Sequence, residues 1–134
     1  MDYQVTIIVP TYNRKAFSEL LLHNMNSQSY KSIKEVLVAD DGDEPLDMTG
    51  CKYPVKYFKM NRISLGVKRN FLKNCVKSGY VACFDTDDFY HPTHIENAMT
   101  ELAMSGKAVA GSADMLIYTV RRFASVSAVC GLIS

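Results

Sequence analysis

The amino-acid sequence predicts an α/β domain in which helices flank a mainly parallel β-sheet. Short runs of β-branched and apolar residues alternate with stretches whose apolar residues recur at helical spacing. The links between them are short, which is typical of strand–helix–strand units and parallel pairing. With 134 residues, the chain is long enough for one sizeable core and too short for two. Loops that follow parallel strands should therefore gather at one edge of a single sheet.

The first strand is predicted at residues 5–9, a β-branched run typical of a central buried strand. Pro10 is expected to end it, because proline cannot continue a strand ladder. A helix should follow, because apolar residues recur there at helical spacing: Phe17, Leu20, Leu21 and Met25. A second buried strand at residues 36–39 completes a βαβ unit, whose crossover should be right-handed.

Two more strand–helix pairs are predicted further along the chain. A strand at residues 55–60 precedes a helix whose Lys and Arg residues lie mostly away from one apolar face: Val67, Phe71, Leu72, Cys75 and Val76. A buried strand at residues 80–84 precedes a helix that ends at Ser105-Gly106. Apolar runs at residues 108–110 and 115–120 predict further strands.

The composition is that of an ordinary globular domain, with 48% apolar and 22% charged residues. A net charge of +1 gives no general attraction to nucleic acid or to anionic membranes, so any phosphate binding must come from local placement. No apolar run approaches the roughly 20 residues needed to span a bilayer. The first residues lack the pattern of a signal peptide, so a cytoplasmic location is expected.

The most informative stretch is Asp85-Thr86-Asp87-Asp88, directly after the strand at residues 80–84. In open α/β sheets, ligands bind beyond the carboxyl ends of the strands. Three carboxylates within four residues repel one another. A divalent cation such as Mg²⁺ or Mn²⁺ would remove that repulsion and could in turn hold a diphosphate. An acidic turn, in which Asp serves only the loop geometry, explains the same residues equally well.

Two other loops, residues 10–14 and 40–43, are expected at the same edge of the sheet. Tyr12 offers a flat face for a base, while Asp40 and Asp41 can accept hydrogen bonds from an N–H group or a ribose hydroxyl. The basic side chains that can neutralise phosphate are Arg14, Arg62 and Arg69. Together these parts fit a nucleotide diphosphate held by a metal. Taken singly, the second loop is also a common turn, and a surface arginine is usually just solvated.

Four segments, in their order and spacing, resemble the nucleotide-sugar-binding N-terminal half of a family 2 glycosyltransferase. They are TIIVPTYNR at residues 6–14, VADDGD at 38–43, Asn61 with GVKRN at 66–70, and FDTDD at 84–88. The resemblance implies the GT-A fold, a Rossmann-like, helix-flanked and mainly parallel sheet, truncated here before the acceptor-binding half. It assigns residues 1–120 to a nucleotide-sugar-binding GT-A domain. Residues 121–134 remain as an apolar tail that could form an edge strand or a subunit contact.

The resemblance also implies roles for the matching residues. Pro10 and Tyr12 resemble the residues that cradle the base, and Asp41 resembles the carboxylate that reads the uracil N–H. The acidic segment resembles the DxD motif, in which Asp87 lies near the ribose and the metal and Asp88 contacts Mn²⁺ or Mg²⁺. The expected nucleotide-binding residues are Pro10, Thr11, Tyr12, Arg14, Asp40, Asp41, Arg69, Asp85 and Asp87, and the expected metal ligands are Asp87 and Asp88.

The activity implied is transfer of a sugar, with inversion, from a nucleotide-diphosphate donor to an acceptor hydroxyl. UDP-sugar is the expected donor, and the metal would stabilise the departing diphosphate. A carboxylate must take the acceptor's proton, and no such base is identifiable. Residues 121–134 contain no Asp or Glu. Asp114 is the last acidic residue and a candidate base, although a simple turn explains it equally well.

Three interpretations of the short chain remain open. The chain could be a fragment of a larger glycosyltransferase, or a non-catalytic nucleotide-sugar-binding or assembly module of the same fold. It could also complete its site by self-association, which the apolar tail favours. Exposed in a monomer, the apolar residues of that tail would form a sticky patch. They are Phe123, Val126, Val129, Leu132 and Ile133.

Overall fold

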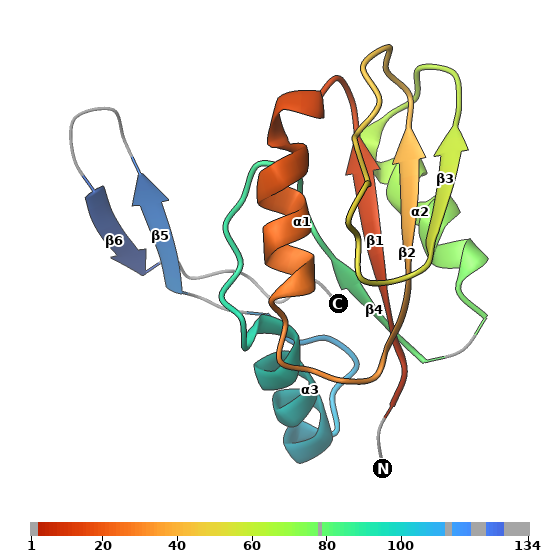
Figure 1. The fold of residues 1–134 in the computed structure, drawn as a ribbon. Helices are drawn as coiled ribbons and strands as arrows, with labels where there is room; N and C mark the ends of the chain where they lie inside the picture. The colour runs from red at the N-terminus through yellow and green to blue at the C-terminus, as the bar shows by residue number, and fades with distance from the viewer. Residues whose placement is uncertain (1–2, 78, 112–113, 119–122, 128–134) are drawn as a thin grey trace.

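Strands and helices alternate along the chain in this computed structural model. It describes residues 3–77, 79–111, 114–118 and 123–127. In chain order the elements are β1 (Val5–Thr11), the 3-10 helix η1 (Lys15–Phe17), α1 (Ser18–Asn26), β2 (Ile33–Asp40), β3 (Val55–Lys59), α2 (Leu65–Cys75), β4 (Tyr80–Cys83), α3 (His94–Ser105), β5 (Asp114–Tyr118) and β6 (Phe123–Ser127). The first four strands form one all-parallel sheet in the order β3-β2-β1-β4 (Figure 1). The predicted α/β fold with a mainly parallel sheet is confirmed.

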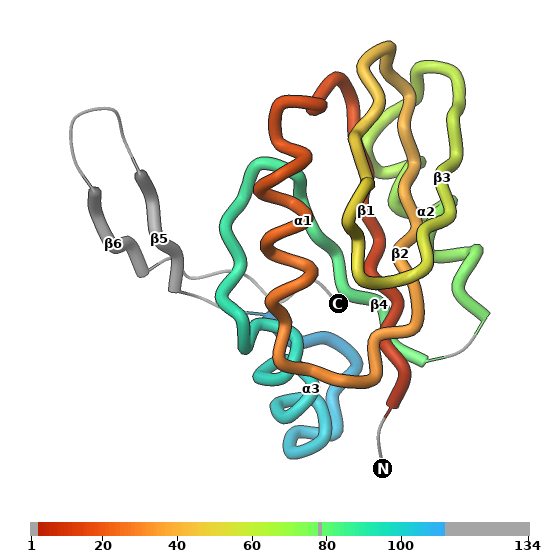
Figure 2. The backbone as a smooth tube through the Cα atoms, in the orientation of Figure 1, coloured from red at the N-terminus to blue at the C-terminus, as the bar shows by residue number. Residues whose placement is uncertain are grey.

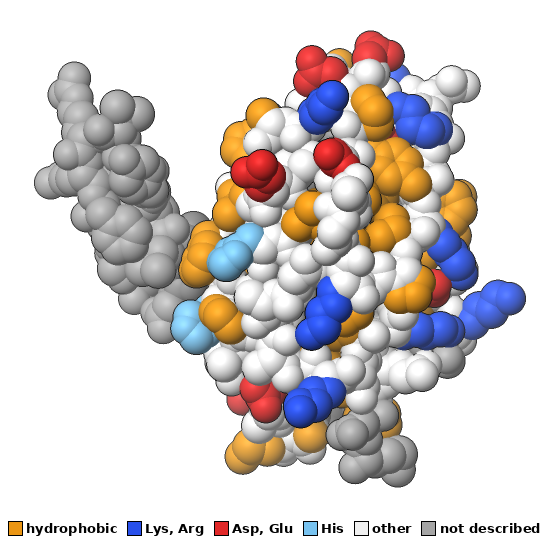
Figure 3. Space-filling model, in the orientation of Figure 1, with side chains coloured by type: hydrophobic (Ala, Val, Ile, Leu, Met, Phe, Trp, Pro, Cys, Tyr) orange, Lys and Arg blue, Asp and Glu red, His pale blue; other side chains and the backbone are white. Residues whose placement is uncertain are grey.

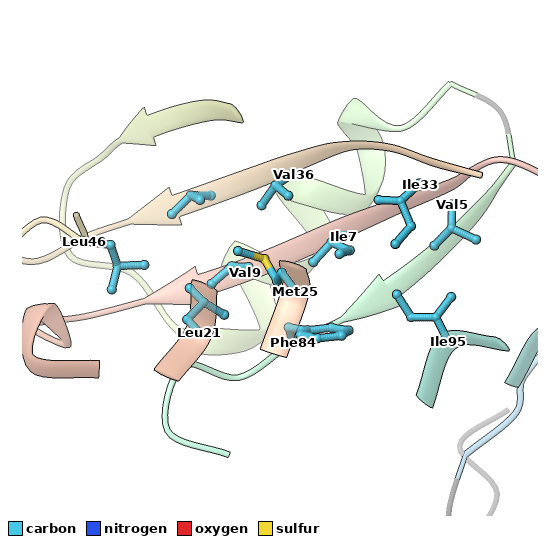
Figure 4. Packing of buried hydrophobic residues seen from close by; sticks show 11 residues of the cluster. Val5, Ile7, Val9, Leu21, Met25, Ile33, Val36, Leu46, Phe84 and Ile95 are labelled. Carbon is cyan, nitrogen blue, oxygen red and sulfur yellow. The ribbon is translucent and has the colours of Figure 1, made fainter. Parts of the chain in front are cut away.

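Helices cover both faces of this sheet, with α1 and α3 on one side and α2 on the other (Figure 1). The side chains of β1 alternate accordingly. Ile7 and Val9 pack in the cluster that includes Leu21 and Met25 of α1, as Figure 4 shows. Ile8 points the other way and packs in the cluster that contains Leu72 of α2. Because β1 and β2 are buried on both faces, their sequences are nearly continuous apolar runs.

Pro10 was expected to end the first strand but lies inside β1. In a parallel strand the N–H and C=O of one residue point to the same neighbour. The Ile8 carbonyl accepts a hydrogen bond from Phe84 N, so Pro10, two residues on, faces the same β4 side. The pairing of β1 with β4 ends at Ile8 opposite Cys83. Pro10 is therefore tolerated because no ladder partner stands opposite its nitrogen.

The buried face of α2 also differs from the prediction. Val67 and Phe71 were expected inside but are 54% and 37% exposed, whereas Lys68 is only 3% exposed. Leu72, one turn after Lys68, is fully buried as predicted. The helix turns this way because the Lys68 ammonium group reaches acceptors at the ends of β1 and β2. An ion pair therefore decides the orientation that apolar spacing alone assigned differently.

The turn before β4 depends on a glycine. Gly79 has φ +90, a conformation that side chains rarely adopt. A Cβ atom there would lie 2.3 Å from the Gln4 carbonyl oxygen, and Tyr80 N donates to the same oxygen. The close approach of the turn to the segment before β1 sets the register in which β4 joins the sheet.

The last part of the described chain is arranged differently from the expectation. Residues 108–110 form no strand, because a three-residue apolar run is at the lower limit of strand length. β5 and β6 pair with each other, antiparallel, as a separate two-stranded sheet. β6 is the described part of the predicted tail; residues 121–122 and 128–134 lie outside the described residues, and a subunit contact stays a prediction. None of the helices in the described ranges is long and apolar enough to cross a membrane.

Candidate functional site

A pocket of about 260 Å³ lies where β1 and β4 end and α2 begins. Its lining combines an aromatic ring with acidic and basic groups: Pro10, Thr11, Tyr12, Arg14, Leu65, Lys68, Arg69, Asp85, Thr86 and Asp87. All predicted nucleotide-binding residues are among them except Asp40 and Asp41. Figure 3 shows acidic and basic side chains gathered at this end of the molecule, where β1, β2 and β3 terminate in Figure 1. The structure thus brings the three predicted loops to one edge of the sheet.

Asp41 is held in a closed network rather than facing open solvent. Lys68 Nζ donates to its Oδ1 at 2.6 Å, while Arg62 Nη1 and Ile63 N donate to its Oδ2 at 2.8 and 2.9 Å. The Asp41 side chain has no exposed surface. Burial alone would raise the pKa of Asp41, but these hydrogen bonds and the charge of Lys68 outweigh it and hold that pKa well below its usual range. Asp41 is therefore ionised and already bonded at both oxygens.

Asp40 faces away from the pocket and organises the turn after β2. Its Oδ1 accepts a hydrogen bond from Gly42 N at 2.8 Å, and its Oδ2 accepts from Tyr57 Oη at 2.6 Å and Lys59 Nζ at 3.3 Å. Burial and this carboxylate raise the pKa of Tyr57, so the phenol remains a donor. These contacts bond Asp40 to its own turn and to β3, and a direct role in nucleotide binding stays a prediction.

The loops after β1 and β2 interlock through Asn13 and Gly42. Asn13 has φ 50, and its Oδ1 accepts hydrogen bonds from the backbone N–H groups of Asp43 at 2.7 Å and Glu44 at 3.1 Å. A Cβ atom on Gly42 would lie 2.5 Å from that same Oδ1. Glycine is needed here because the two backbones approach too closely for a side chain. The interlock fixes the position of Tyr12, which directly precedes Asn13.

The Tyr12 ring is covered by Arg62. The guanidinium carbon lies 3.5 Å from the ring centroid, and the two side chains are otherwise open to solvent, with Tyr12 40% exposed as a residue and the Arg62 side chain 62% exposed. A cation held over an aromatic face is attracted by the ring's quadrupole. Arg62 thus links the predicted base-stacking ring to the Asp41 carboxylate.

Beside them, Thr11 lines the pocket and carries one buried polar atom without a partner. Its backbone carbonyl accepts a hydrogen bond from Lys68 Nζ at 3.2 Å. Its Oγ1 is buried and is the one such side-chain atom without a hydrogen-bond partner among the described residues. A buried hydroxyl without a partner is costly, so a ligand atom that bonds to it would gain stability.

The acidic loop after β4 has an open side. Asp85 is tied down, because Arg69 Nη2 lies 3.2 Å from its Oδ1 and Tyr90 Oη accepts a hydrogen bond from its N–H at 2.8 Å. Asp87 is exposed and has no hydrogen bond or ion pair with any described residue. Partial burial, followed by the nearby charges of Asp85 and Asp87, raises the pKa of Asp88. A nearby cation would offset the repulsion between these carboxylates.

No three Asp, Glu, His or Cys side chains in the described ranges form a cluster that could hold a metal ion by themselves. Magnesium is commonly bound through one or two carboxylates together with the phosphates of a substrate. The oxygen ligands of Asp87 and Asp88 therefore fit a cation that also needs a diphosphate to complete its coordination.

Two buried side chains hold the acidic loop from behind, one from α1 and one from just after its end. Asn24, fully buried, donates through Nδ2 to the Asp88 carbonyl at 2.7 Å and accepts from Tyr90 N at 3.1 Å. Gln28 donates to the His91 carbonyl at 3.0 Å and accepts from Ile95 N at 3.0 Å. Figure 2 shows this segment running along α1 before it reaches α3. Two buried side chains thus fix the backbone on both sides of Phe89.

Tyr90 closes the same loop from the side of the sheet. Its ring stacks on Phe84 with centroids 4.3 Å apart, and His94 meets it edge-on at 4.9 Å. Burial raises the pKa of Tyr90 to about 12, so its hydroxyl stays protonated. Burial also lowers the pKa of His94, which therefore packs as a neutral ring.

Asn24, Gln28 and Lys68 were not predicted from the sequence. For two of them a usable signal was present, because each is a polar or charged residue spaced three or four positions from an apolar residue of a buried helix face. Asn24 is three after Leu21 on α1, and Lys68 is four before Leu72 on α2, whereas Gln28 lies beyond the end of α1. What that signal omits is the partner, which lies far away in sequence.

Comparison with known proteins places the chain in a family. The Glycosyl transferase family 2 model matches residues 6–126. Glycosyltransferase GlyA of Streptococcus pneumoniae serotype 4 is 28% identical over 102 residues, which cover 72% of this chain and 14% of GlyA. The chain thus spans about a seventh of the length of this relative.

Solved structures share the fold. The Pyrobaculum calidifontis mannosyltransferase PcManGT, in complex with GDP-Man and Mn²⁺, superposes with a TM-score of 0.64 at 24% identity, covering 77% of this chain and 33% of that one. TarS 1-349 of S. aureus, in complex with UDP, gives a TM-score of 0.62 at 21% identity, covering 82% of this chain and 39% of that one. The four-stranded sheet therefore matches the N-terminal part of GT-A glycosyltransferases. With the family model matching most of its length, the chain belongs to glycosyl transferase family 2.

Proposed function

We propose that this chain is the donor-binding part of a glycosyltransferase that moves a sugar, with inversion, from a nucleoside-diphosphate donor to an acceptor hydroxyl. UDP is the nucleotide we expect, with Mn²⁺ or Mg²⁺ as the cofactor. One observation carries the proposal: the pocket sets Tyr12, Arg69 and the unpartnered Asp87 around one space at the carboxyl edge of the sheet. An aromatic face, a phosphate-binding cation and a hard oxygen ligand are the three groups that a metal-bound nucleoside diphosphate requires.

In this proposal each group of the pocket has a part. Tyr12 and Pro10 receive the base, and the unpartnered Thr11 Oγ1 accepts or donates a hydrogen bond to the nucleoside. Arg14 and Arg69 neutralise phosphate charge, although Arg69 already pairs with Asp85 and must share its guanidinium. Asp87 and Asp88 would hold the cation, which supplies charge stabilisation as the diphosphate departs. The bound GDP-Man with Mn²⁺ in PcManGT and the bound UDP in TarS support this chemistry by analogy of fold.

A second candidate is a module that binds the donor without transferring its sugar. The observation that favours it is the lining of the pocket, where Asp85 and Asp87 are the only carboxylates among the described residues. Both belong to the proposed metal segment, so neither is free to take the acceptor's proton. Asp114, the other candidate for a base, is the first residue of β5, and its role stays a prediction. Turnover of a UDP-sugar, rather than binding, separates the two candidates.

Calorimetric titration tests the proposal. UDP is titrated into the wild-type chain with Mn²⁺ and with a chelator, and both titrations are repeated on Asp88→Ala. We expect UDP binding to depend on Mn²⁺ and to weaken roughly tenfold or more in the variant, the usual scale for losing a metal-binding partner. Glu101→Ala, which removes an exposed carboxylate from α3, is the control and should bind as wild type. A folded protein that binds none of UDP, GDP and dTDP would overturn the proposal.

A further inference from the structure

We propose that Arg62 occupies the place of the nucleobase on the Tyr12 ring, at the border of the donor pocket, and leaves when the nucleotide binds, so that this one side chain sets the affinity for the donor. The inference rests on the proposed nucleotide-sugar function. It concerns a residue for which no role was expected beyond neutralising phosphate.

The guanidinium group of Arg62 makes two contacts. Its carbon atom lies over the Tyr12 ring, 3.5 Å from the ring centroid. One of its N–H groups donates a hydrogen bond to Asp41 Oδ2 at 2.8 Å. A planar group that stacks on the ring and donates a hydrogen bond to the adjacent carboxylate makes both contacts expected of a base. Arg62 and a base therefore cannot use Tyr12 and Asp41 in the same way at the same time.

Of the two cations on Asp41, Arg62 is the one that can leave. Its side chain is 62% exposed, whereas the Lys68 side chain is 4% exposed and also bonds to the Thr11 carbonyl. With Arg62 gone, Lys68 and Ile63 N still bond to Asp41. The buried carboxylate is thus never left without a counter-charge, which is the situation that makes breaking a buried ion pair costly.

The exchange also selects among bases. When Arg62 leaves, Asp41 Oδ2 loses one donor and remains an acceptor. Uracil and guanine carry a ring N–H that can replace the lost donor. Cytosine and adenine carry an unprotonated ring nitrogen on the same edge, which would face the carboxylate as a second acceptor. The displacement is therefore favoured for a base with a ring N–H.

The test compares ligands that do and do not carry a base. UDP and inorganic pyrophosphate are each titrated, with saturating Mn²⁺, into wild type, Arg62→Ala and Arg62→Lys. Loss of an exposed cation–π contact and an exposed ion pair corresponds to roughly threefold to thirtyfold in affinity. We expect Arg62→Ala to bind UDP tighter than wild type by that factor and to bind pyrophosphate unchanged. Arg62→Lys keeps a cation for Asp41 but has no planar face, so its affinity for UDP should lie between those of wild type and Arg62→Ala.

Lys56→Ala is a matched control. The Lys56 side chain is also 62% exposed and also pairs with a largely buried acid, Glu35, at 3.0 Å, but it lies on β3 and its partner is not Asp41. It should bind both ligands as wild type. A second arm adds guanidinium chloride, far below denaturing concentration, to Arg62→Ala. The free cation should refill the position and return UDP affinity towards the wild-type value.

The outcomes separate the inference from the function on which it rests. If wild type binds UDP and Arg62→Ala binds it equally or more weakly, Arg62 is a ligand contact or a bystander, and the inference fails while the donor site stands. If tighter binding extends to pyrophosphate, the effect is on phosphate charge and the inference again fails. If no nucleotide binds to folded wild type or to either variant, both the inference and the proposed function fail.

Discussion

Asp41 and Asp88 lie in loops at the same edge of the sheet, where Asp41 was predicted to bind the nucleotide and Asp88 the metal, yet their surroundings are opposite. Asp41 has no exposed side-chain surface, three donors on its two oxygens and a depressed pKa. Asp88 is exposed, lies beside two like charges and has a raised pKa. An aspartate is thus part of the scaffold after β2, as Asp41, and open to a ligand after β4, as Asp88.

The difference comes from where the cations stand. Lys68 of α2 enters the core and fixes Asp41, while Arg69, the next residue, stays partly exposed and reaches Asp85. No described cation pairs with Asp87 or Asp88. An acidic motif is therefore informative about ligands only when the fold leaves its charge uncompensated.

The strongest test of this contrast is Asp41→Asn. It leaves Lys68 buried without a counter-charge, which should lower the free energy of unfolding by about 3–5 kcal/mol at neutral pH. That is a large part of the roughly 5–15 kcal/mol typical of a domain. Urea denaturation measures the change. The double variant Asp41→Asn with Lys68→Met removes both charges and should recover part of the loss; if it does not, the ion pair is not the cause.

The same network has a pH signature. The Asp41 pKa is lower in the folded protein than the ordinary value of 3.8, so its stabilisation is complete above pH 3.8 and is lost as the pH falls further. Wild type should therefore lose more stability than Asp41→Asn when the pH is lowered from 5 to 2.5, as followed by thermal denaturation. Parallel curves for the two proteins would contradict the assignment.

A smaller effect is expected at the support of the acidic loop. Asn24→Ala leaves the Asp88 carbonyl and Tyr90 N without their partners, which should cost about 1–3 kcal/mol and loosen the metal segment. UDP affinity should fall in Mn²⁺ and stay unchanged in a chelator, because only the metal-dependent contacts lose their geometry. Calorimetry under both conditions makes the comparison.

The matched control for that variant lies on the same helix. Asn26 also makes two backbone hydrogen bonds, donating to the Gly50 carbonyl and accepting from Lys52 N, but this loop is remote from the pocket residues. Asn26→Ala should lose some stability and keep the full response to Mn²⁺. Equal loss of the Mn²⁺ response in both variants would mean that the effect is general loosening of α1.

The smallest expected effect is that of Asp88→Asn on the free energy of unfolding. Unlike the variants above, this one should be more stable than wild type. A raised pKa means that the ionised carboxylate opposes folding, so this destabilisation grows as the pH rises from 3.8 through the folded-state pKa. At pH 7 the variant should be more stable than wild type, by no more than about 0.5 kcal/mol, a typical limit for a surface substitution. The advantage should vanish below pH 3.8 in thermal denaturation. A variant less stable than wild type at pH 7 would show that Asp88 supports the fold.

The sequence was sufficient for the parts that depend on local pattern. β1 and β2 were predicted because strands buried on both faces are continuous apolar runs. β4 was also predicted, but as a buried strand, whereas it lies at the edge of the sheet and exposes Val81 and Cys83. The order of these strands along the chain then placed three loops at one edge, and the pocket contains residues of two of them, including Tyr12 and Asp85. Residue pattern and strand order together thus predicted two of the loops that line the pocket, and a third loop, after β2, that does not.

What could not be predicted depends on long-range partners. Helical spacing treats Lys68 as a surface residue, and its partner Asp41 is 27 residues away. Asn24 bonds to main-chain atoms 64 and 66 residues on, a relation that no local window contains. The stacking of Arg62 on Tyr12 likewise follows from how two loops meet in space. The sequence identified which residues carry charge, and the fold decided which charges remain available.

The nitrogen of Pro10 has a consequence beyond its own strand. Because it offers no hydrogen to the β4 side, the bond that would follow the one from Phe84 N to the Ile8 carbonyl is lost from the ladder between β1 and β4. The pairing of the two strands ends there, and Pro10 and Asp85, which follow the last pair, both line the pocket. The missing hydrogen therefore helps to end the pairing of β1 with β4, and the pocket forms directly beyond the last paired residues.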